Sequence, residues 1–375
     1  MSPHATLDER ERRDRLRLIR CESVGPVTWR RLIERFGSAG RAIEALPDLA
    51  RRGGRHAPLA LPSLDEIEHE LRALAHVDAR LLVLGEAAYP PALAAIEDAP
   101  PTLAVRGNVE VLSRCSVAIV GSRNASISGS RLAGTLAADL GRAGLVVVSG
   151  MARGIDSAAH RGALPTGTVA VLAGGIDVVY PPENAELYAA IVSAGAVVAE
   201  LPPTSQPLAR HFPRRNRIIA GLSSAVLVVE AGLRSGSLIT ARFALEQGRD
   251  VFAVPGSPLD PRSRGGNDLI RQGAVLTETA DDVLSMLLGA RDRIVAEPVT
   301  PTSPPEDEAE QGEDPRRLIA ALLSPTPVSV DEIIRTCQLS PAIVTTILLE
   351  WELAGQLERH PGNRVSVIVS GSEQA

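Results

Sequence analysis

Short apolar runs, mostly β-branched, recur through the middle of the chain and alternate with stretches of helical periodicity. The predicted strands are 115–120, 145–148, 168–172, 196–199, 225–229 and 250–254, and the predicted helices are 126–141, 155–164, 185–193, 216–222 and 238–247. Apolar strands that alternate with helices are typical of a parallel sheet covered on both faces. We therefore predict an α/β fold with a Rossmann-like core over residues 96–290. Ligands of such sheets bind at the carboxyl ends of the strands.

Residues 1–95 show the period of helices instead of strands. Helices are predicted at 12–21, 26–36, 39–45 and 63–74. Val24, Gly25 and Pro26 form a small-residue turn between the first two, and proline suits the first turn of a helix. This pattern predicts a small helical domain of the SAM or helix-hairpin-helix type. Its hairpin either presents backbone amides to DNA phosphates or serves only for packing, and the residues leave both roles open.

Residues 316–375 predict a winged-helix-like domain. Helices are predicted at 316–323, 330–337 and 341–354, followed by a hairpin of 357–359 and 365–369. The helix that such a domain would place in a DNA groove, 341–353, carries Glu350 and Glu352 and no arginine. The sequence therefore favours protein contacts for this domain, with DNA binding as the alternative.

Acidic residues are concentrated between the core and this C-terminal domain. Residues 294–315 hold seven acidic residues, several prolines and no arginine, so 291–315 is predicted to be a disordered linker. Outside 294–315 the chain has 39 basic and 38 acidic residues, although its formal net charge is −6. The folded parts are therefore nearly neutral, and their charge is clustered locally.

All 39 basic residues are arginine, and the chain has no lysine. A Walker A loop and Schiff-base chemistry, including that of pyridoxal phosphate, require a lysine, so these classes of protein are excluded. Arginine still binds phosphate well, because its planar guanidinium donates two hydrogen bonds at once.

The three cysteines, Cys21, Cys115 and Cys337, lie far apart and form no CxxC pair. Neither a disulfide framework nor a zinc site is therefore expected. No apolar run reaches the length of a membrane span, and residues 1–20 lack the apolar segment of a secretory signal. We expect a cytoplasmic protein that has no membrane contact, no metal and no cofactor.

Glycine-rich turns follow four of the predicted strands. They contribute Gly121, Ser122 and Arg123; Ser149, Gly150, Arg153 and Gly154; Gly174 and Gly175; and, at the start of a helix, Ser235, Gly236 and Ser237. Backbone amides at such turns and at helix N-termini bind anions. Each turn alone is ordinary. Because the carboxyl ends of parallel strands meet at one edge of a sheet, the four together predict a single anion-binding crevice.

An arginine-rich segment is expected to close this crevice. Its candidate residues are Arg210, Phe212, Arg214, Arg215, Asn216 and Arg217. No acidic residue lies between Leu201 and Val229 to neutralise the arginines. Phe212 is expected either to stack on a nucleobase or to pack beneath the loop. The predicted ligand is one that carries phosphate groups.

Asp156 and His160 lie one turn apart on the predicted helix 155–164. A Ser-His-Asp triad of the hydrolase type would need the nucleophile elbow G-x-S-x-G, which the chain lacks. We therefore expect a structural interaction between Asp156 and His160.

Six motifs resemble those of the DNA-processing protein A family (DprA, or Smf) in order and wording. They are VGSR at 120–123, SGMARGID at 149–156, AGGID at 173–177, FPRRNRIIAGLS at 212–223, SGSLITA at 235–241 and AVPG at 253–256. The match is dense over about 117–274, and the helical region and the winged-helix-like tail resemble the three-domain form of the family.

The resemblance implies a non-enzymatic homodimer that binds single-stranded DNA taken up in natural transformation, protects it and loads the RecA recombinase onto it. It implies no nucleotide and no metal. Matched by motif, Arg123 would contact the DNA backbone and Phe212 would pack beside a base. The other matched residues would form a basic loop and shape the pocket: Arg214, Arg215, Arg217, Gly150 and Gly174. Some relatives have lysine at such contacts, where this chain has arginine.

Two enzyme classes with related folds are the alternatives. Nucleoside-monophosphate phosphoribohydrolases carry a PGG-x-GT-x2-E pattern, whereas residues 231–237 have the sequence AGLRSGS without the downstream glutamate. Dinucleotide-dependent oxidoreductases need a G-x-G-x-x-G turn, which does not continue from Gly121. The phosphoribohydrolase is therefore the first alternative to a DNA-binding protein.

Overall fold

The computed structural model describes residues 7–291, 314–360 and 362–368 of the 375-residue chain. The chain forms two compact units. The first consists of Met1–Arg12 and Leu64–Ala296, and the second of Arg13–Ser63 and Glu297–Ala375. Within the described ranges, no helix is long and apolar enough to cross a membrane.

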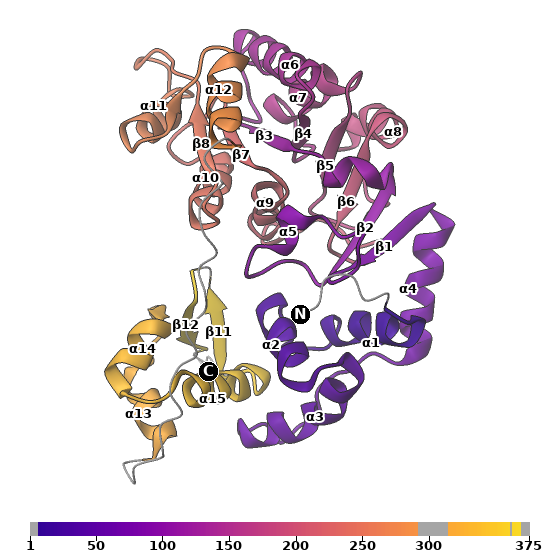
Figure 1. Cartoon of the computed structure of the whole chain (residues 1–375), viewed down its shortest axis with the longest axis vertical. Helices are drawn as coiled ribbons and strands as arrows, with labels where there is room; N and C mark the ends of the chain where they lie inside the picture. Colours follow the sequence, from indigo (N-terminus) through magenta and orange to yellow (C-terminus); the bar gives the residue numbers. More distant parts are fainter. Residues whose placement is uncertain (1–6, 292–313, 361, 369–375) are drawn as a thin grey trace, which may run out of the picture. The chain divides into compact units, whose positions relative to one another are not determined.

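The first unit is built on one sheet, in which the described residues form nine strands in the order β1-β2-β6-β5-β4-β3-β7-β8-β9 (Figure 1). The strands are β1 (Ala79–Val83), β2 (Thr102–Gly107), β3 (Ser116–Val120), β4 (Val146–Ser149), β5 (Thr168–Val171), β6 (Ala196–Ala199), β7 (Ala225–Val228), β8 (Asp250–Ala253) and β9 (Val275–Leu276). Neighbouring strands from β6 to β9 in that order are all parallel. The predicted α/β fold with a parallel core is confirmed, and each of the six predicted strands is present.

Two antiparallel strands at one edge of the sheet lie outside the predicted set. β2 pairs antiparallel with β6, and β1 pairs antiparallel with β2. The apolar run within each strand is only three residues long, at 81–83 and 103–105, and an arginine adjoins it. A short apolar run does not by itself distinguish a strand from a buried helix segment, so periodicity leaves both strands unassigned.

Helices cover both faces of the sheet. Successive residues of β3 point to opposite faces, so its side chains contribute to two apolar cores. Val117 and Ile119 of β3 share a core with residues of α6 (Ile127–Arg142), α7 (Ile155–Ala163) and α12 (Ala280–Arg291). Ala118 and Val120 share the other with residues of α5 (Pro91–Ala94), α9 (His211–Leu222) and α10 (Gly236–Glu246). The remaining helical segments of this unit are α4 (Leu64–His76), α8 (Ala185–Ala194), α11 (Arg264–Arg271) and the short 3-10 helices Val109–Ser113 and Pro182–Asn184.

Helices α6 and α7 approach closely because glycines face each other between them. A Cβ atom at Gly162 would lie 2.2 Å from the carbonyl oxygen of Gly134, whereas one at Gly134 would meet the carbonyl oxygen of Ala158 at an ordinary 3.5 Å. We expect Gly162→Ala to lower the free energy of unfolding by about 1–3 kcal/mol, because overpacking forces the helices apart. Gly134→Ala in the same contact should leave it unchanged or slightly raised, since alanine favours a helix. Urea unfolding separates the two variants, and equal effects would contradict the packing argument.

The second unit contains most of the N-terminal helices. Helix α1 (Glu9–Ile19) begins in the first unit, and α2 (Pro26–Phe36) and α3 (Ala39–Arg52) lie wholly in the second. Pro26 begins α2, as predicted. Helix α3 is longer than the predicted 39–45 and continues through Pro47, because burial of Leu46 and Leu49 outweighs the hydrogen bond that proline cannot donate.

The same unit contains a winged helix, as predicted for the C-terminal residues. Its elements are α13 (Pro315–Leu322), β10 (Val328–Ser329), α14 (Val330–Cys337), α15 (Pro341–Leu353), β11 (Leu357–His360) and β12 (Arg364–Val367). The strands pair in the order β10-β12-β11, and Ile319, Val344 and Val365 are fully buried in the core of the domain. The domain bounds 1–95, 96–290 and 316–375 stay predictions. The predicted linker 291–315 lies, except for its ends, outside the described residues.

Candidate nucleic-acid interface

A cavity of about 630 Å³ opens at the carboxyl ends of β3 and β7 in the first unit. The chain passes from β3 through β4 and β5 to β6 on one side, and then places β7 on the other side of β3. The loops that leave β3 and β7 therefore diverge and leave a crevice, which is where ligands of doubly wound sheets bind.

Half of the predicted site residues line this cavity. They are Gly121, Ser122, Arg123, Phe212, Arg215, Asn216, Ser235, Gly236 and Ser237. Asn124, Asp156, Arg234 and Arg262 line it too, although they were not predicted as site residues. Arg234 directly precedes Ser235, which was predicted as a site residue, and this adjacency is the signal that could have identified Arg234. Arg262 comes from a loop after β8 that has no phosphate-binding motif.

The turn after β3 is held in place by the turn after β4. The backbone N–H of Ile155 donates to the oxygen of Ser122 (3.2 Å). Gly154 has a φ of +75°, and a Cβ atom on it would lie 2.3 Å from that same oxygen. A Cβ atom at Gly121 would lie 2.6 Å from Cγ1 of Ile155. These glycines therefore let the two turns pack against each other, which fixes the edge of the cavity.

Arg123 and Phe212 form a cation–π pair on the cavity wall. The guanidinium carbon of Arg123 lies 5.0 Å from the centroid of the Phe212 ring, and the arginine side chain is exposed. The Phe212 ring also packs against Tyr180, with ring centroids 5.8 Å apart. Phe212 is half-buried and lines the cavity, so it combines the two roles that the sequence left open.

Arg215 and Asp156 place two buried ionisable groups, one basic and one acidic, at the cavity. Arg215 Nη1 donates to the oxygen of Val171 (3.0 Å), and Asp156 Oδ2 accepts from the N–H of Ala152 (3.2 Å). A Cβ atom at Gly150 would lie 1.8 Å from Arg215 Nη1 and 2.8 Å from Asp156 Oδ2, so a larger residue there would displace these two side chains. Burial raises the pKa of Asp156, which the charge of Arg215 opposes, and burial lowers the pKa of Arg215 to about 10. Arg215 therefore stays charged at neutral pH.

Arg217 is not a lining residue and instead anchors helix α9. Its Nη1 donates to the backbone oxygen of Asp98 (2.6 Å), and its Nη2 forms an ion pair with Glu200. Its side chain is only 7% exposed. Both acidic residues lie outside the acid-free stretch 201–229, so the expectation of an unneutralised arginine cluster is wrong for Arg217. The fold supplies acids that the local sequence does not contain.

The other predicted residues lie outside the cavity lining. Ser149 is buried and donates to the oxygen of Ile119 (2.6 Å). A Cβ atom at Gly174 or at Gly175 would lie 2.6 Å from a carbonyl oxygen of the loop before α9, so both glycines serve to seat that loop. Among the predicted site residues, Arg153, Arg210 and Arg214 are exposed and do not line the cavity.

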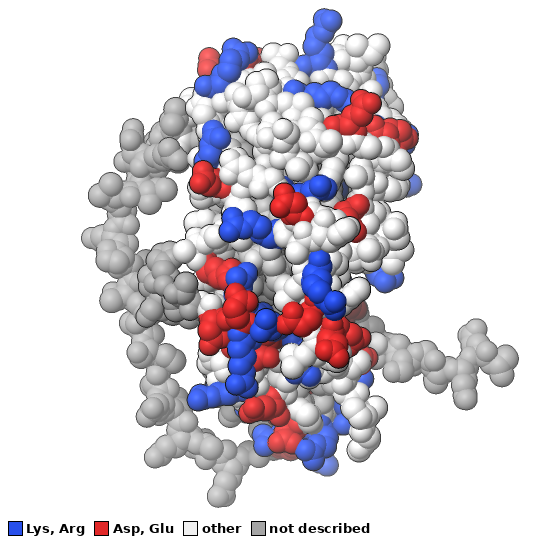
Figure 2. All heavy atoms as spheres, turned by 90° about the vertical axis from the view of Figure 1, so that its right-hand side faces the viewer, with Lys and Arg blue, Asp and Glu red and all other residues white. Residues whose placement is uncertain are grey.

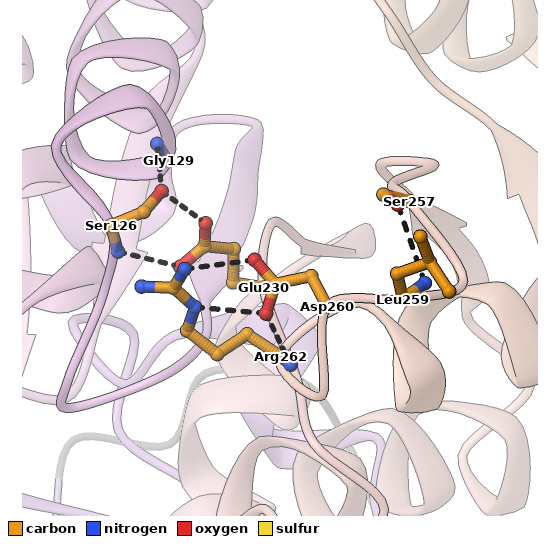
Figure 3. A network of polar contacts seen from close by, with 7 residues as sticks. All are labelled: Ser126, Gly129, Glu230, Ser257, Leu259, Asp260 and Arg262. Atoms are coloured by element: carbon orange, nitrogen blue, oxygen red, sulfur yellow. Dashed lines mark hydrogen bonds and ion pairs between the residues drawn. The ribbon is translucent and has the colours of Figure 1, made fainter.

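Glu230, which comes shortly after β7, holds the start of helix α6 (Figure 3). Its carboxylate accepts hydrogen bonds from the N–H (2.9 Å) and the hydroxyl of Ser126, whose oxygen in turn accepts from the N–H of Gly129 (2.8 Å). Arg262 lies beside Glu230 in Figure 3 and pairs with Asp260, with 2.8 Å between Nη2 and Oδ2. Hydrogen bonding to Asp260 raises the pKa of Arg262, and the charge of Glu230 adds to this. The loop after β3 is thereby tied to the end of β7.

His160 does not pair with Asp156, so the expected structural interaction between them is wrong. The Nδ1 atom of His160 is hydrogen-bonded to the hydroxyl of Thr168 (2.8 Å), and the ring is fully buried. Burial lowers the pKa of His160 to about 3. The ring is therefore neutral at physiological pH and belongs to the core.

The lowered pKa of His160 predicts a loss of stability in mild acid. In the unfolded chain a histidine has a pKa of about 6.5, so the unfolded state is protonated first when the pH falls. The stability that His160 contributes is therefore fully present above about pH 6.5 and is lost progressively as the pH falls toward 3. Between about pH 7 and about pH 5 this amounts to about 2 kcal/mol. His160→Asn retains a partner for Thr168 and should lose about 2 kcal/mol less than the unchanged protein over that range in urea unfolding. An identical pH dependence in both proteins would contradict the assignment.

Charges of both signs lie side by side on the molecular face drawn in Figure 2. Among the coloured residues of that face, arginines and acidic residues alternate across white surface instead of forming one broad field of a single sign. This face therefore offers an anion no broad field of positive charge.

Three family models match successive parts of the chain. The model described as DNA recombination-mediator protein A matches residues 80–288. The model of a DprA-like N-terminal HHH domain matches 9–73, and that of a DprA winged helix domain matches 301–363.

Similar sequences and solved structures agree with these matches. Protein Smf of Escherichia coli (strain K12) is 41% identical over 302 residues, which is 80% of this chain and 80% of that protein. DNA processing protein DprA of Streptococcus pneumoniae is 49% identical over 199 residues, 52% of this chain and 70% of that protein. Its X-ray structure covers 75% of this chain and 98% of that chain, with a TM-score of 0.62 and 37% identity. A structure of DNA processing protein A from Helicobacter pylori was solved to describe its single-stranded DNA binding mode. The match covers 58% of this chain and 98% of that chain, with a TM-score of 0.53 and 29% identity. The chain belongs to the DNA-processing protein A (DprA/Smf) family.

Proposed function

We propose that this protein binds single-stranded DNA in the cavity between β3 and β7, protects incoming DNA and loads the RecA recombinase onto it during natural transformation. The Arg123–Phe212 pair carries the proposal, since it offers a guanidinium to a phosphate and an aromatic face to a base. Proteins that bind single strands without sequence preference combine a positively charged groove with aromatic rings, because every base has a face that can stack. The Helicobacter pylori relative, solved for its single-stranded DNA binding mode, supports this ligand.

Backbone amides add to the phosphate-binding character of the cavity. Helix α10 begins at Gly236, and Ser235 caps it by accepting from the N–H of Ser237 (3.3 Å). A helix N-terminus attracts an anion because its first amides have no partners within the helix. The proposed DNA contacts are Gly121, Ser122, Arg123, Phe212, Arg215, Asn216, Arg234, Ser235, Gly236 and Ser237. Exposed arginines outside the lining, Arg153, Arg210 and Arg214, are proposed as weaker contacts for the strand beyond the cavity.

A binding role without catalysis fits the way in which the candidate catalytic groups are engaged. Glu230 is occupied by Ser126, and His160 is buried, neutral and bonded to Thr168. Among the described residues that line the cavity, the acidic one is Asp156, which is itself buried. A phosphoribohydrolase-like enzyme remains the alternative, and release of a free base from a nucleoside monophosphate would support it.

Fluorescence anisotropy with a labelled poly-dT strand and with a duplex of the same length tests the proposed binding. We expect the single strand to bind more tightly, and the logarithm of its affinity to fall linearly with the logarithm of salt concentration, because phosphate contacts release counterions. Equal binding of both DNAs, or no binding at low salt, would overturn the proposal.

RecA loading and dimer formation are proposed from the family resemblance and are tested separately. RecA-dependent ATP hydrolysis on DNA coated with single-strand-binding protein should start sooner when this protein is added. Light scattering should give the mass of two chains in solution, and cell fractionation should place the protein in the cytoplasm. Tight DNA binding without acceleration of RecA would remove the loader function and leave the DNA-binding function intact.

A further inference from the structure

Helix α15 of the winged helix is buried on two sides. Val344 and Leu348 lie in the core of the winged helix itself. Leu349 and Leu353 are 2% and 0% exposed, although neither belongs to that core. Glu350, which is 3% exposed, is paired with Arg316 of α13 within the winged helix. Another part of the molecule must therefore cover the C-terminal half of α15.

The N-terminal helical segment supplies this cover, and it lies in the same compact unit as the winged helix. Helix α3 ends at Arg52 and is followed by the C-cap residue Gly53, where a Cβ atom would lie 2.0 Å from the backbone oxygen of Glu350 and 2.9 Å from Cβ of Ala354. The backbones of α3 and α15 are therefore in direct contact at this point. Gly53 has a φ of −73°, which any residue adopts, so glycine is needed here for space and not for conformation.

A partly buried hydrogen bond joins helix α2 to helix α15. The hydroxyl of Thr28, which is fully buried, donates to Oε1 of Glu352. Oε2 of Glu352 accepts from Nε of Arg359 in β11 (3.3 Å), and the Glu352 side chain is only 11% exposed. A carboxylate so far from water needs such partners. Glu352, which in the sequence argues against DNA binding, is therefore bound to both the N-terminal segment and the wing.

We propose that the C-terminal half of α15 is a protein-docking surface whose partner is the N-terminal helical segment, residues 13–63, of the same chain. The second helix of a helix-turn-helix is the one that enters a DNA groove, and α15 holds that position after α14. While it is docked, this half of α15 is closed to a DNA groove, and any protein that uses it competes with α2 and α3. This docking is independent of the DNA-binding cavity between β3 and β7.

Hydrogen exchange on the intact chain tests the docking. Gly53→Ala should raise exchange in a peptide that covers 349–356 by about tenfold or more, because the added methyl group separates α3 from α15. Gly25→Ala in the same unit is the matched control, since a Cβ atom there meets nothing within 4 Å, and it should leave exchange unchanged. Thr28→Val removes the hydroxyl without changing the shape and should raise exchange in the same peptide. Unchanged exchange in both Gly53→Ala and Thr28→Val would overturn the proposal.

Protection measured across a wide range of protein concentration distinguishes docking within one chain from docking between two copies. Docking within the chain predicts the same protection at every concentration. Protection that is lost on dilution would overturn the assignment of the partner to the same chain. Peptides of α2 and of β12 should stay protected in Gly53→Ala, which separates undocking from unfolding. If the α2 and β12 peptides lose their protection in Gly53→Ala, that variant is unfolded and the test rests on Thr28→Val alone. Unchanged exchange in Thr28→Val would then overturn the proposal.

Discussion

Arg123→Ala is expected to weaken single-strand binding by about ten- to a hundredfold at low salt and to leave the melting temperature unchanged. The Arg123 guanidinium is exposed, and its cation–π contact with Phe212 is at the surface, so its removal costs the fold little. A hydrogen bond between charged groups contributes about 1.5–3 kcal/mol, which corresponds to that range of affinity. The slope of log affinity against log salt should fall by about 0.7, as expected for the loss of one phosphate contact with a single strand.

Arg153→Ala is the matched control for Arg123→Ala. Arg153 is exposed and belongs to the neighbouring turn, but it does not line the cavity. Its removal should change the affinity far less, although the net charge changes by the same amount. Equal losses in the two variants would show that the chain binds DNA through diffuse charge, and the cavity would then not be the site.

Arg217→Ala is expected to lower the free energy of unfolding by about 3–5 kcal/mol, because it leaves a partly buried carboxylate without its partner. Arg217 is bonded to Glu200 and to the backbone oxygen of Asp98, and its side chain is almost wholly buried. For a unit of this size each kcal/mol lowers the melting temperature by about 2–4 °C, so a decrease of about 10 °C is expected in calorimetry.

Arg214→Ala provides the comparison for Arg217→Ala. Arg214 is exposed in the same helix turn, so its removal should leave the melting temperature within about 1 °C of the unchanged protein. The family resemblance places both arginines in one DNA-binding loop, whereas the contacts of Arg217 give it a structural role. A normal melting temperature combined with lost DNA binding in Arg217→Ala would favour the DNA-binding role.

The local pattern of apolar and polar residues predicted those elements whose burial is the same along their whole length. β3 and β7 are buried on both faces, so their continuous apolar runs identify them, and the turn at Gly121, Ser122 and Arg123 follows directly. β1 and β2 escape prediction because the apolar run within each is only three residues long, and because β2 pairs with β6, far along the chain. Helix α3 is predicted to end before Pro47 because the burial that sustains it is tertiary.

The side-chain pairings of the site depend on contacts that no local window contains. Arg217 donates to Asp98, which lies 119 positions away, and Glu230 binds Ser126, which lies 104 positions away. Motif matching groups Arg217 with Arg215 because they are neighbours in sequence. On a helix these two side chains point in different directions, so Arg215 reaches the cavity while Arg217 meets Glu200.

The buried carboxyl of Asp156 makes the cavity sensitive to protons as well as to anions. Burial raises the pKa of Asp156, the charge of Arg215 opposes that rise, and the carboxyl lines the cavity. A phosphodiester bound near Arg215 brings a further negative charge and raises the pKa of Asp156 again. Binding and proton uptake are therefore thermodynamically linked, so affinity for the anion increases as the pH falls. If the cavity binds nucleic acid as proposed, the strand and the proton are cooperative ligands of it.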